Sequence, residues 1–181
     1  GGGECWVGVE GQGEGRMIKG ILVINNHGKP RLTKFYEHIP VERQQAMIKE
    51  CFMLISKRSD RVCNFLEDVG AWSKDTKLVY RVYATLYFIF VVDGSESELG
   101  ILDLIHVFVE SLDHVFENVC ELDLIFHTDK VHHILDEVVM GGMVLETNLQ
   151  EILTSVKEQE ELESKGSKIA QAKFKIKQQL R

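Results

Sequence analysis

The sequence predicts an α+β domain, in which helices pack on the faces of an antiparallel sheet. Three observations predict this class. Most strand-like segments lie before residue 93, most helix-like segments follow it, and the expected order is β-β-α-β-β-β-α-α-α. The chain has 181 residues, of which 44% are hydrophobic and 27% are charged, as is typical of one globular domain.

The composition changes at residue 17. Residues 1–16 hold seven of the fifteen glycines, so we expect a flexible Gly-rich extension there. We expect the folded domain over residues 17–157 and a charged, mobile C-terminal tail over 158–181. The longest apolar run, 86–92, is too short for a transmembrane helix, and we expect no secretory signal.

The first elements are a hairpin and a helix. Residues 18–25 are rich in β-branched side chains and residues 26–30 have turn chemistry, so 18–36 predicts a β-hairpin. Pro40 stands where a helix can begin, and apolar residues recur at helical spacing over 41–57.

Three strand-like segments come next. A short apolar patch at 64–66 lies in a polar, turn-rich stretch, and residues 78–83 alternate as an exposed strand would. Residues 84–92 are apolar nearly throughout, which predicts a central strand covered on both faces.

The helix expected over 97–119 has the clearest pattern in the chain. Ser95 and Glu98 predict a capping box at its start. Its apolar arc spans about 160° at about 100° per residue, which is wider than contact with one sheet requires. The excess comes from an extra row formed by Leu102, Val109 and Phe116. Either a neighbouring helix or loop covers this row, or part of it lines a groove.

The remaining elements are shorter. Residues 121–126 predict an apolar link, and 129–139 predicts a helix that Gly141 and Gly142 stop. Thr147 and Gln150 predict a second capping box.

A last amphipathic helix is expected from residue 149, and its apolar face fades after 157. Residues 168–181 carry five basic side chains and no acidic one, interleaved with apolar residues. This pattern fits a solvated tail or a weak contact with an anionic membrane.

No residue set indicates catalysis or metal binding. His106, Glu110 and His114 share a helix face, but His106 and His114 would lie about 12 Å apart, too far for one ion. The four cysteines show no CxxC spacing and read as reduced thiols. We therefore predict a protein that is not an enzyme and needs no cofactor or metal. A net charge of −7 argues against nucleic-acid binding.

Several long segments carry a family resemblance. They are GKPRLTKFY at 28–36, NFLE at 64–67, LVYRVYATLYF at 78–88, DGSESELGILDLIHVFVESLD at 93–113, NVCELDLIF at 118–126 and GGMVLETN at 141–148. Together they resemble the small (sigma) chain of clathrin-type adaptor complexes, most of all that of adaptor protein complex 3. The resemblance covers residues 17 to about 157.

The resemblance implies a longin-like (SNARE-like) fold with a five-stranded antiparallel sheet between helices. It also implies a non-catalytic subunit of a heterotetramer, whose partners are a large delta-like solenoid subunit and medium and beta-type subunits. Such a complex is cytoplasmic and peripheral on Golgi, endosome and vesicle membranes. It selects cytosolic tails of membrane cargo for transport between the trans-Golgi network, endosomes and lysosome-related organelles.

The resemblance further implies a binding site. Sigma chains hold the pocket for the acidic dileucine signal, an acidic residue followed by three arbitrary residues and then Leu-Leu or Leu-Ile. By motif, Arg31 would pair with the acidic residue, and Asn118 would bond to the peptide backbone. The leucine pockets would be lined by Tyr83, Ala84, Leu86, Val109, Asn118, Val119 and Leu124.

A second hypothesis assigns the chain to a different class. It would be a longin-domain subunit of a trafficking regulator, either a tether or a platform for small-GTPase exchange. Stable pairing with another longin domain and a GTPase would favour that role. Co-purification with a large solenoid subunit would favour the adaptor.

Overall fold

The computed structural model describes residues 18–58, 64–67, 69–70, 72 and 75–179, with the side chains of the last helix described as far as residue 168. The predicted Gly-rich extension, 1–16, lies outside these residues. The elements are β1 (Ile18–Asn25), β2 (Pro30–Phe35), α1 (Val41–Ser56), β3 (Phe65–Glu67), β4 (Thr76–Tyr83), β5 (Leu86–Asp93), α2 (Glu98–Phe116), α3 (Glu121–Phe126), α4 (Thr128–Val138), β6 (Val139–Met140), β7 (Met143–Val144) and α5 (Leu149–Gln179).

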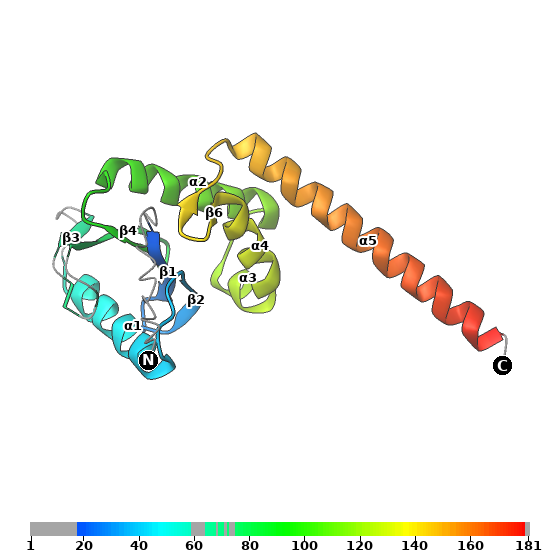
Figure 1. Cartoon of the computed structure of the whole chain (residues 1–181), viewed down its shortest axis with the longest axis horizontal. Coiled ribbons are helices and arrows are strands. Elements are labelled where there is room, and N and C mark those ends of the chain that lie inside the picture. Colours follow the sequence, from blue (N-terminus) through cyan, green and yellow to red (C-terminus); the bar gives the residue numbers. More distant parts are fainter. Residues whose placement is uncertain (1–17, 59–63, 68, 71, 73–74, 180–181) are drawn as a thin grey trace, which may run out of the picture.

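Five strands form one antiparallel sheet in the order β2-β1-β5-β4-β3 (Figure 1). This confirms the predicted fold class. The fifth strand begins later than expected, at Leu86, because Tyr83 and Leu86 pair across a tight turn of Ala84 and Thr85. Ala84 has a φ of 51°, a left-handed conformation that hairpin turns often need.

The sheet separates two apolar layers, because successive side chains of a strand point to opposite faces. On one face α1 contributes Met47, Cys51 and Ile55, which join the strand residues Leu22, Leu78, Tyr80, Ile89 and Val91. The other face is covered by α2 together with α4 and the start of α5 (Figure 1). Its strand residues include Ile21, Val23, Val79, Phe88 and Phe90.

The start of α2 differs from the predicted capping box. Ser97 is the N-cap, and its hydroxyl accepts a hydrogen bond from the Gly100 amide at 3.4 Å. Ser95 lies in a turn, where its amide and hydroxyl both donate to the carboxylate of Asp93. Glu98 pairs with Lys77 at 2.6 Å. The prediction was wrong because Asp93 competes for Ser95, which leaves Ser97 to cap the helix.

The extra apolar row of α2 is covered. Val109 is buried, and Leu102 and Phe116 are half-buried against the same core. Both α4 and α5 contact α2. Of the two interpretations left open by the sequence, cover by neighbouring helices is the one that this conformation supports.

Two further predictions need correction. Residues 121–126 form a helix, α3, because the carboxylate of Asp123 bonds back to the Cys120 amide and caps its first turn. At the start of α5, Asn148 is the capping residue rather than Thr147, since its side-chain oxygen accepts from the Gln150 amide at 3.0 Å.

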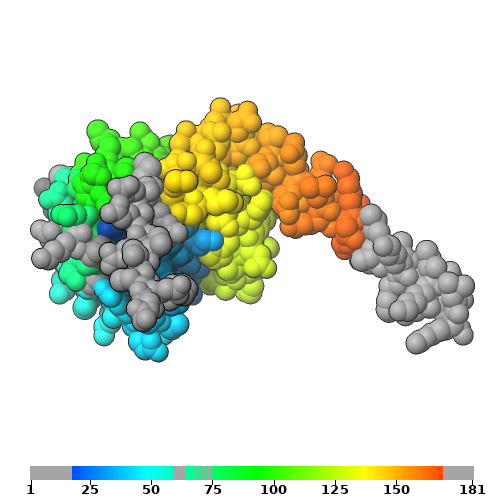
Figure 2. Space-filling model, in the orientation of Figure 1, coloured from blue at the N-terminus to red at the C-terminus, as the bar shows by residue number. Residues whose placement is uncertain are grey.

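Helix α5 leaves the body of the protein (Figures 1 and 2). Its backbone stays helical to Gln179, whereas the sequence placed a tail after residue 157. Val156 is the last buried side chain among those described, and every described side chain from Glu160 to Lys168 is exposed. No helix among the described residues has the length and apolar character needed to cross a membrane.

Gly28 gives a test of the turn between β1 and β2. Its φ is +80°, and an added Cβ would lie 2.9 Å from the Phe52 ring of α1. Gly28→Ala should therefore destabilise the protein by about 1–2 kcal/mol from the backbone conformation, and by more if the ring cannot move. Denaturant unfolding measures the change.

Gly166→Ala in α5 is the matched control, because nothing lies within 4 Å of the added Cβ. It should be neutral or slightly stabilising. Equal stability of the Gly28→Ala variant and the parent would contradict the assigned turn.

Candidate functional site

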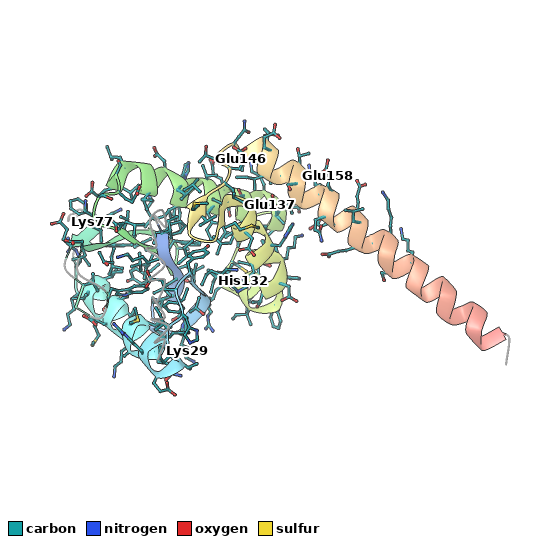
Figure 3. The ribbon with its side chains drawn as sticks, in the orientation of Figure 1. Lys29, Lys77, His132, Glu137, Glu146 and Glu158 are labelled. Carbon is teal, nitrogen blue, oxygen red and sulfur yellow. The ribbon has the colours of Figure 1, made fainter. Side chains whose placement is uncertain are left out.

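The strand register gathers two turns at one end of the sheet. Asn25 pairs with Leu86, and Leu86 pairs with Tyr83, so the turn at 26–29 lies beside the turn at 84–85. We call this the turn end. In Figure 3, the labelled Lys29 marks this end of the sheet and the labelled Lys77 marks the opposite end. The candidate residues Arg31, Tyr83, Ala84 and Leu86 therefore lie at the same end of the sheet, although they come from three strands and a turn.

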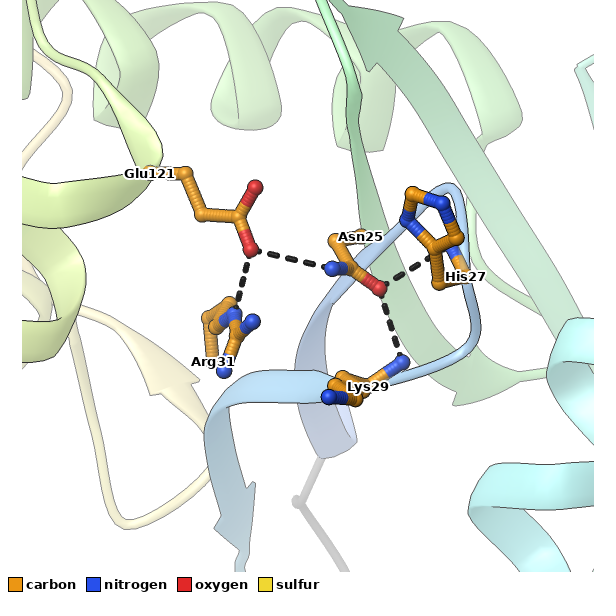
Figure 4. A network of polar contacts seen from close by, with 5 residues as sticks. All are labelled: Asn25, His27, Lys29, Arg31 and Glu121. Carbon is orange, nitrogen blue, oxygen red and sulfur yellow. Dashed lines mark hydrogen bonds and ion pairs between the residues drawn. The ribbon is translucent and has the colours of Figure 1, made fainter.

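A network of polar contacts joins the turn end to α3 (Figure 4). Glu121, in the first turn of α3, accepts through Oε1 from Arg31 Nε at 2.7 Å and from Asn25 Nδ2 at 3.0 Å. Asn25 is a buried polar residue, and its Oδ1 accepts the backbone amides of His27 and Lys29 at 3.0 and 2.8 Å. This side chain therefore fixes both the turn and the docking of α3.

The network lowers the pKa of Glu121. The hydrogen bond from the Arg31 guanidinium is the largest cause and the bond from Asn25 the second, since both stabilise the ionised carboxylate. Because the pKa is lowered, the pair stabilises the fold at pH values above 4.5, the ordinary pKa of a glutamate. This contribution is lost as the pH falls through the lowered pKa.

The candidate pocket residues differ in exposure. Leu86, Val109 and Leu124 are 5%, 4% and 1% exposed and belong to one core cluster, against which Tyr83 and Val119 are half-buried. Aromatic contacts continue this cluster inward, from Tyr83 to Phe88 to Phe108. In this conformation the chain's own side chains fill the apolar part of the site.

Two hollows flank these residues. One has a volume of about 530 Å³ and lies mainly on the α1 side of the sheet, where Ile55, Tyr80 and Tyr87 line it together with Tyr83. The other, about 390 Å³, is lined by Asn118 and carries Asp113 and Glu117. Of these two hollows, the one at Asn118 is formed by α2 and the α2–α3 link, on the same face of the sheet as the closed apolar cluster.

Tyr83 also has polar contacts at the edge of the site. Its hydroxyl accepts from Arg81 Nη1 at 3.2 Å and lies 3.4 Å from Nδ1 of His106, which is one helical turn before Val109. His106 faces Glu110 at 3.3 Å, as a solvated pair on α2. Within the described part of the chain, no group of three metal-ligating side chains is present.

The link between α2 and α3 carries Asn118 and Val119. Glu117 and Asn118 both have a positive φ, 52° and 78°. Asp113 holds the link, because its carboxylate accepts the Val119 amide at 3.0 Å and its carbonyl accepts the Asn118 amide at 3.2 Å. The Asn118 side chain is exposed and, among the described residues, has no hydrogen-bond partner. Its amide can therefore bond to a peptide backbone.

Sequence reasoning missed Asn25 and Glu121 as members of this site. Glu121 stands inside the segment that carried the family resemblance, but its partner Arg31 is 90 positions away. Asn25 ends an apolar strand and precedes a turn, which gave a signal for the turn and none for the contact with α3.

Comparisons with known proteins identify the family. The clathrin adaptor complex small chain family matches residues 17–163. The chain belongs to this family. Its members are non-catalytic subunits, which confirms the prediction that the chain is not an enzyme.

Two curated relatives in the adaptor small-chain family are 65% identical to this chain over 150 residues. The AP-3 complex subunit sigma of Dictyostelium discoideum aligns over 81% of this chain and 88% of its own length. The human AP-3 complex subunit sigma-2 aligns over 81% and 77%. The AP-3 complex subunit sigma of Arabidopsis thaliana is 50% identical over 154 residues, 85% of this chain and 93% of its own. These matches confirm the resemblance to sigma chains of adaptor protein complex 3.

A structural comparison of this adaptor small chain agrees. A chain in a homology model of the full-length AP-3 complex, in a stretched open conformation, superposes with a TM-score of 0.65 and 43% identity. The match covers 84% of this chain and 99% of the other. It supports the expected longin-like arrangement of sheet and helices.

The role of Asn25 can be tested by Asn25→Ala. The change removes a buried amide and leaves two turn amides and Glu121 without this partner, so it should destabilise the protein by about 1–3 kcal/mol. Asn26→Ala is the control, because Asn26 is exposed in the same turn and should cost less than about 0.5 kcal/mol. Thermal unfolding measures both, and equal effects would refute the anchoring role of Asn25.

Proposed function

We propose that this chain is the sigma subunit of an AP-3-type adaptor complex and serves a vesicle coat as a binding module without turnover. The support is its 65% identity to AP-3 sigma subunits over most of the chain. In this proposal it assembles with a large delta-like subunit and with medium and beta-type subunits. The complex carries it, as a peripheral component, to Golgi, endosome and vesicle membranes.

The proposed ligand is the acidic dileucine signal in the cytosolic tails of membrane cargo. The observation that carries this proposal is the convergence of candidate residues at the turn end: Arg31 of β2, the β4–β5 turn and the α2–α3 link lie around one apolar cluster. In the proposed complex, Arg31 faces the acidic residue, and Asn118 bonds to the peptide backbone.

The closed cluster sets the expected affinity. Two leucines would enter only if the link at 117–120 or the Tyr83 ring moves away from Leu86 and Val109. Burial of each leucine contributes about 1.5–3 kcal/mol, and opening the cluster and ordering the peptide offset much of it. We therefore expect weak, reversible binding, which suits a sorting step.

Exposed apolar residues support a partner subunit beside this site. Leu122 is 59% exposed and Phe126 is 74% exposed, both on the outer face of α3, with Ile125 next to them. Apolar patches of this kind commonly mark an interface between proteins. In our proposal the large subunit covers this face, so α3 links assembly to signal binding.

A variant of the α2–α3 link tests the pocket. Val119 is half-buried at its edge, so Val119→Asp places a charge where a leucine would bind and should reduce peptide binding at least about tenfold. Val109→Asp is less suitable, because Val109 is 4% exposed and a buried charge would disturb the fold itself. Fluorescence anisotropy with a labelled peptide and the assembled complex measures the affinity.

Val41→Asp is the matched control for Val119→Asp. Val41 is 61% exposed on α1, on the other face of the sheet, and its replacement should leave binding unchanged. Thermal unfolding checks that both variants fold. Normal binding by a folded Val119→Asp variant would refute the proposed pocket.

Arg31→Ser tests the contact with the acidic residue. It removes the cation and leaves Glu121 without its ion-pair partner, so binding should weaken by about two- to fivefold, less so at high salt. Lys49→Ser removes the same charge from the exposed surface of α1 and should have no effect. A salt-independent loss, or an equal loss in both variants, would contradict the assignment of Arg31.

A further inference from the structure

Glu121 already accepts from one donor of Arg31, the cation proposed to face the acidic residue of the signal. Its Oε1 lies 2.7 Å from Arg31 Nε, and the two side chains keep 28% and 21% of their surface exposed. Both groups are therefore within reach of a peptide at the surface. Because one guanidinium carries five N–H donors, a bond to Nε leaves other donors for a second acceptor.

Glu121 cannot leave Arg31 without a second loss. The same Oε1 accepts from Asn25 Nδ2 at 3.0 Å, and Asn25 is itself fixed by the two turn amides that it accepts. Rotation of Glu121 away from Arg31 would also break this bond to a buried amide. The carboxylate is thus held in place when a ligand arrives.

Arg31 is already paired with a carboxylate, and the charged groups near the pair are of both signs. The nearby turn carries Lys29 and also His27, which helps to lower the pKa of Glu121, while Asp123 lies in the same helical turn as Glu121. Among the described residues, Arg31 has no ion pair other than that with Glu121. An acidic side chain that approaches Arg31 therefore meets a neutralised cation and a neighbouring carboxylate.

We propose that Glu121 is a specificity-determining residue of the dileucine site. Glu121 competes with the acidic residue of the peptide for Arg31. It therefore reduces the preference of the site for Glu or Asp over Gln or Asn four positions before the first leucine. A neutral amide can bond to the remaining N–H donors of Arg31 without repulsion from Glu121. This inference rests on the proposed function.

The experiment compares two peptides and two proteins. The peptides carry Glu or Gln four positions before Leu-Leu and are otherwise identical. The proteins are the assembled complex with the parent chain and with Glu121→Gln, which keeps a side-chain oxygen that can accept from Arg31 and Asn25. The measured quantity is the ratio of the two peptide dissociation constants.

We expect Glu121→Gln to increase the preference for the Glu peptide by about two- to fivefold at low salt, as removal of a local charge at an exposed pair would do. The gain should shrink at about 1 M salt, where the screening length is about 3 Å. Glu121→Asp, which keeps the charge and shortens the side chain by one methylene, should give a smaller gain and serves if the Gln variant does not assemble.

Glu117→Gln is the matched control. Glu117 is exposed on the adjacent link and, among the described residues, has no ion pair, so the change in net charge is the same without the contact to Arg31. The inference is overturned if Glu121→Gln leaves the preference for the Glu peptide unchanged or reduces it, or if Glu117→Gln increases that preference equally. In either case the proposed peptide binding itself is not contradicted. If neither peptide binds the parent complex, the proposed function fails and this inference fails with it.

Discussion

One oxygen atom of Glu121 connects α3 to the first two strands at the turn end of the sheet. It accepts from Arg31 on β2 and from Asn25 at the end of β1, while its own backbone begins α3. The link that carries Asn118 and Val119 leads into α3 and is held from the other side by Asp113 of α2. The arrangement of the polar groups at the β1–β2 turn and at the start of α3 therefore depends on where this carboxylate is held.

The apolar part of the site depends on a different constraint. The register of three central strands aligns Asn25, Leu86 and Tyr83, and α2 lies across them so that Val109 is buried in the same cluster. Packing of this density stabilises the fold and also closes the pocket. A ligand must therefore replace apolar contacts within the chain by contacts with its own leucines. Its affinity reports the difference in free energy between the closed cluster and the opened, occupied one.

The sequence predicted the fold better than the site. Alternating and continuous apolar segments predicted β1, β4 and β5, because burial on one or both faces imposes those patterns. Periodicity could not decide how the extra row of α2 is covered, since the cover comes from tertiary packing against elements far away in the sequence. The cap at Ser97 and the helix at 121–126 were missed because Asp93 and Asp123 act through their side chains on nearby backbone amides.

Helix α5 has a practical consequence for anyone who labels this protein. From Val156, its last buried side chain among those described, to Gln179 the helix extends about 35 Å at about 1.5 Å per residue (Figure 1). A fluorophore or affinity tag attached at this end would stand well clear of the sheet and of both helical layers. Distance measurements from such a label would then report how partner chains arrange themselves around the domain, with the side chains of the turn end left unaltered.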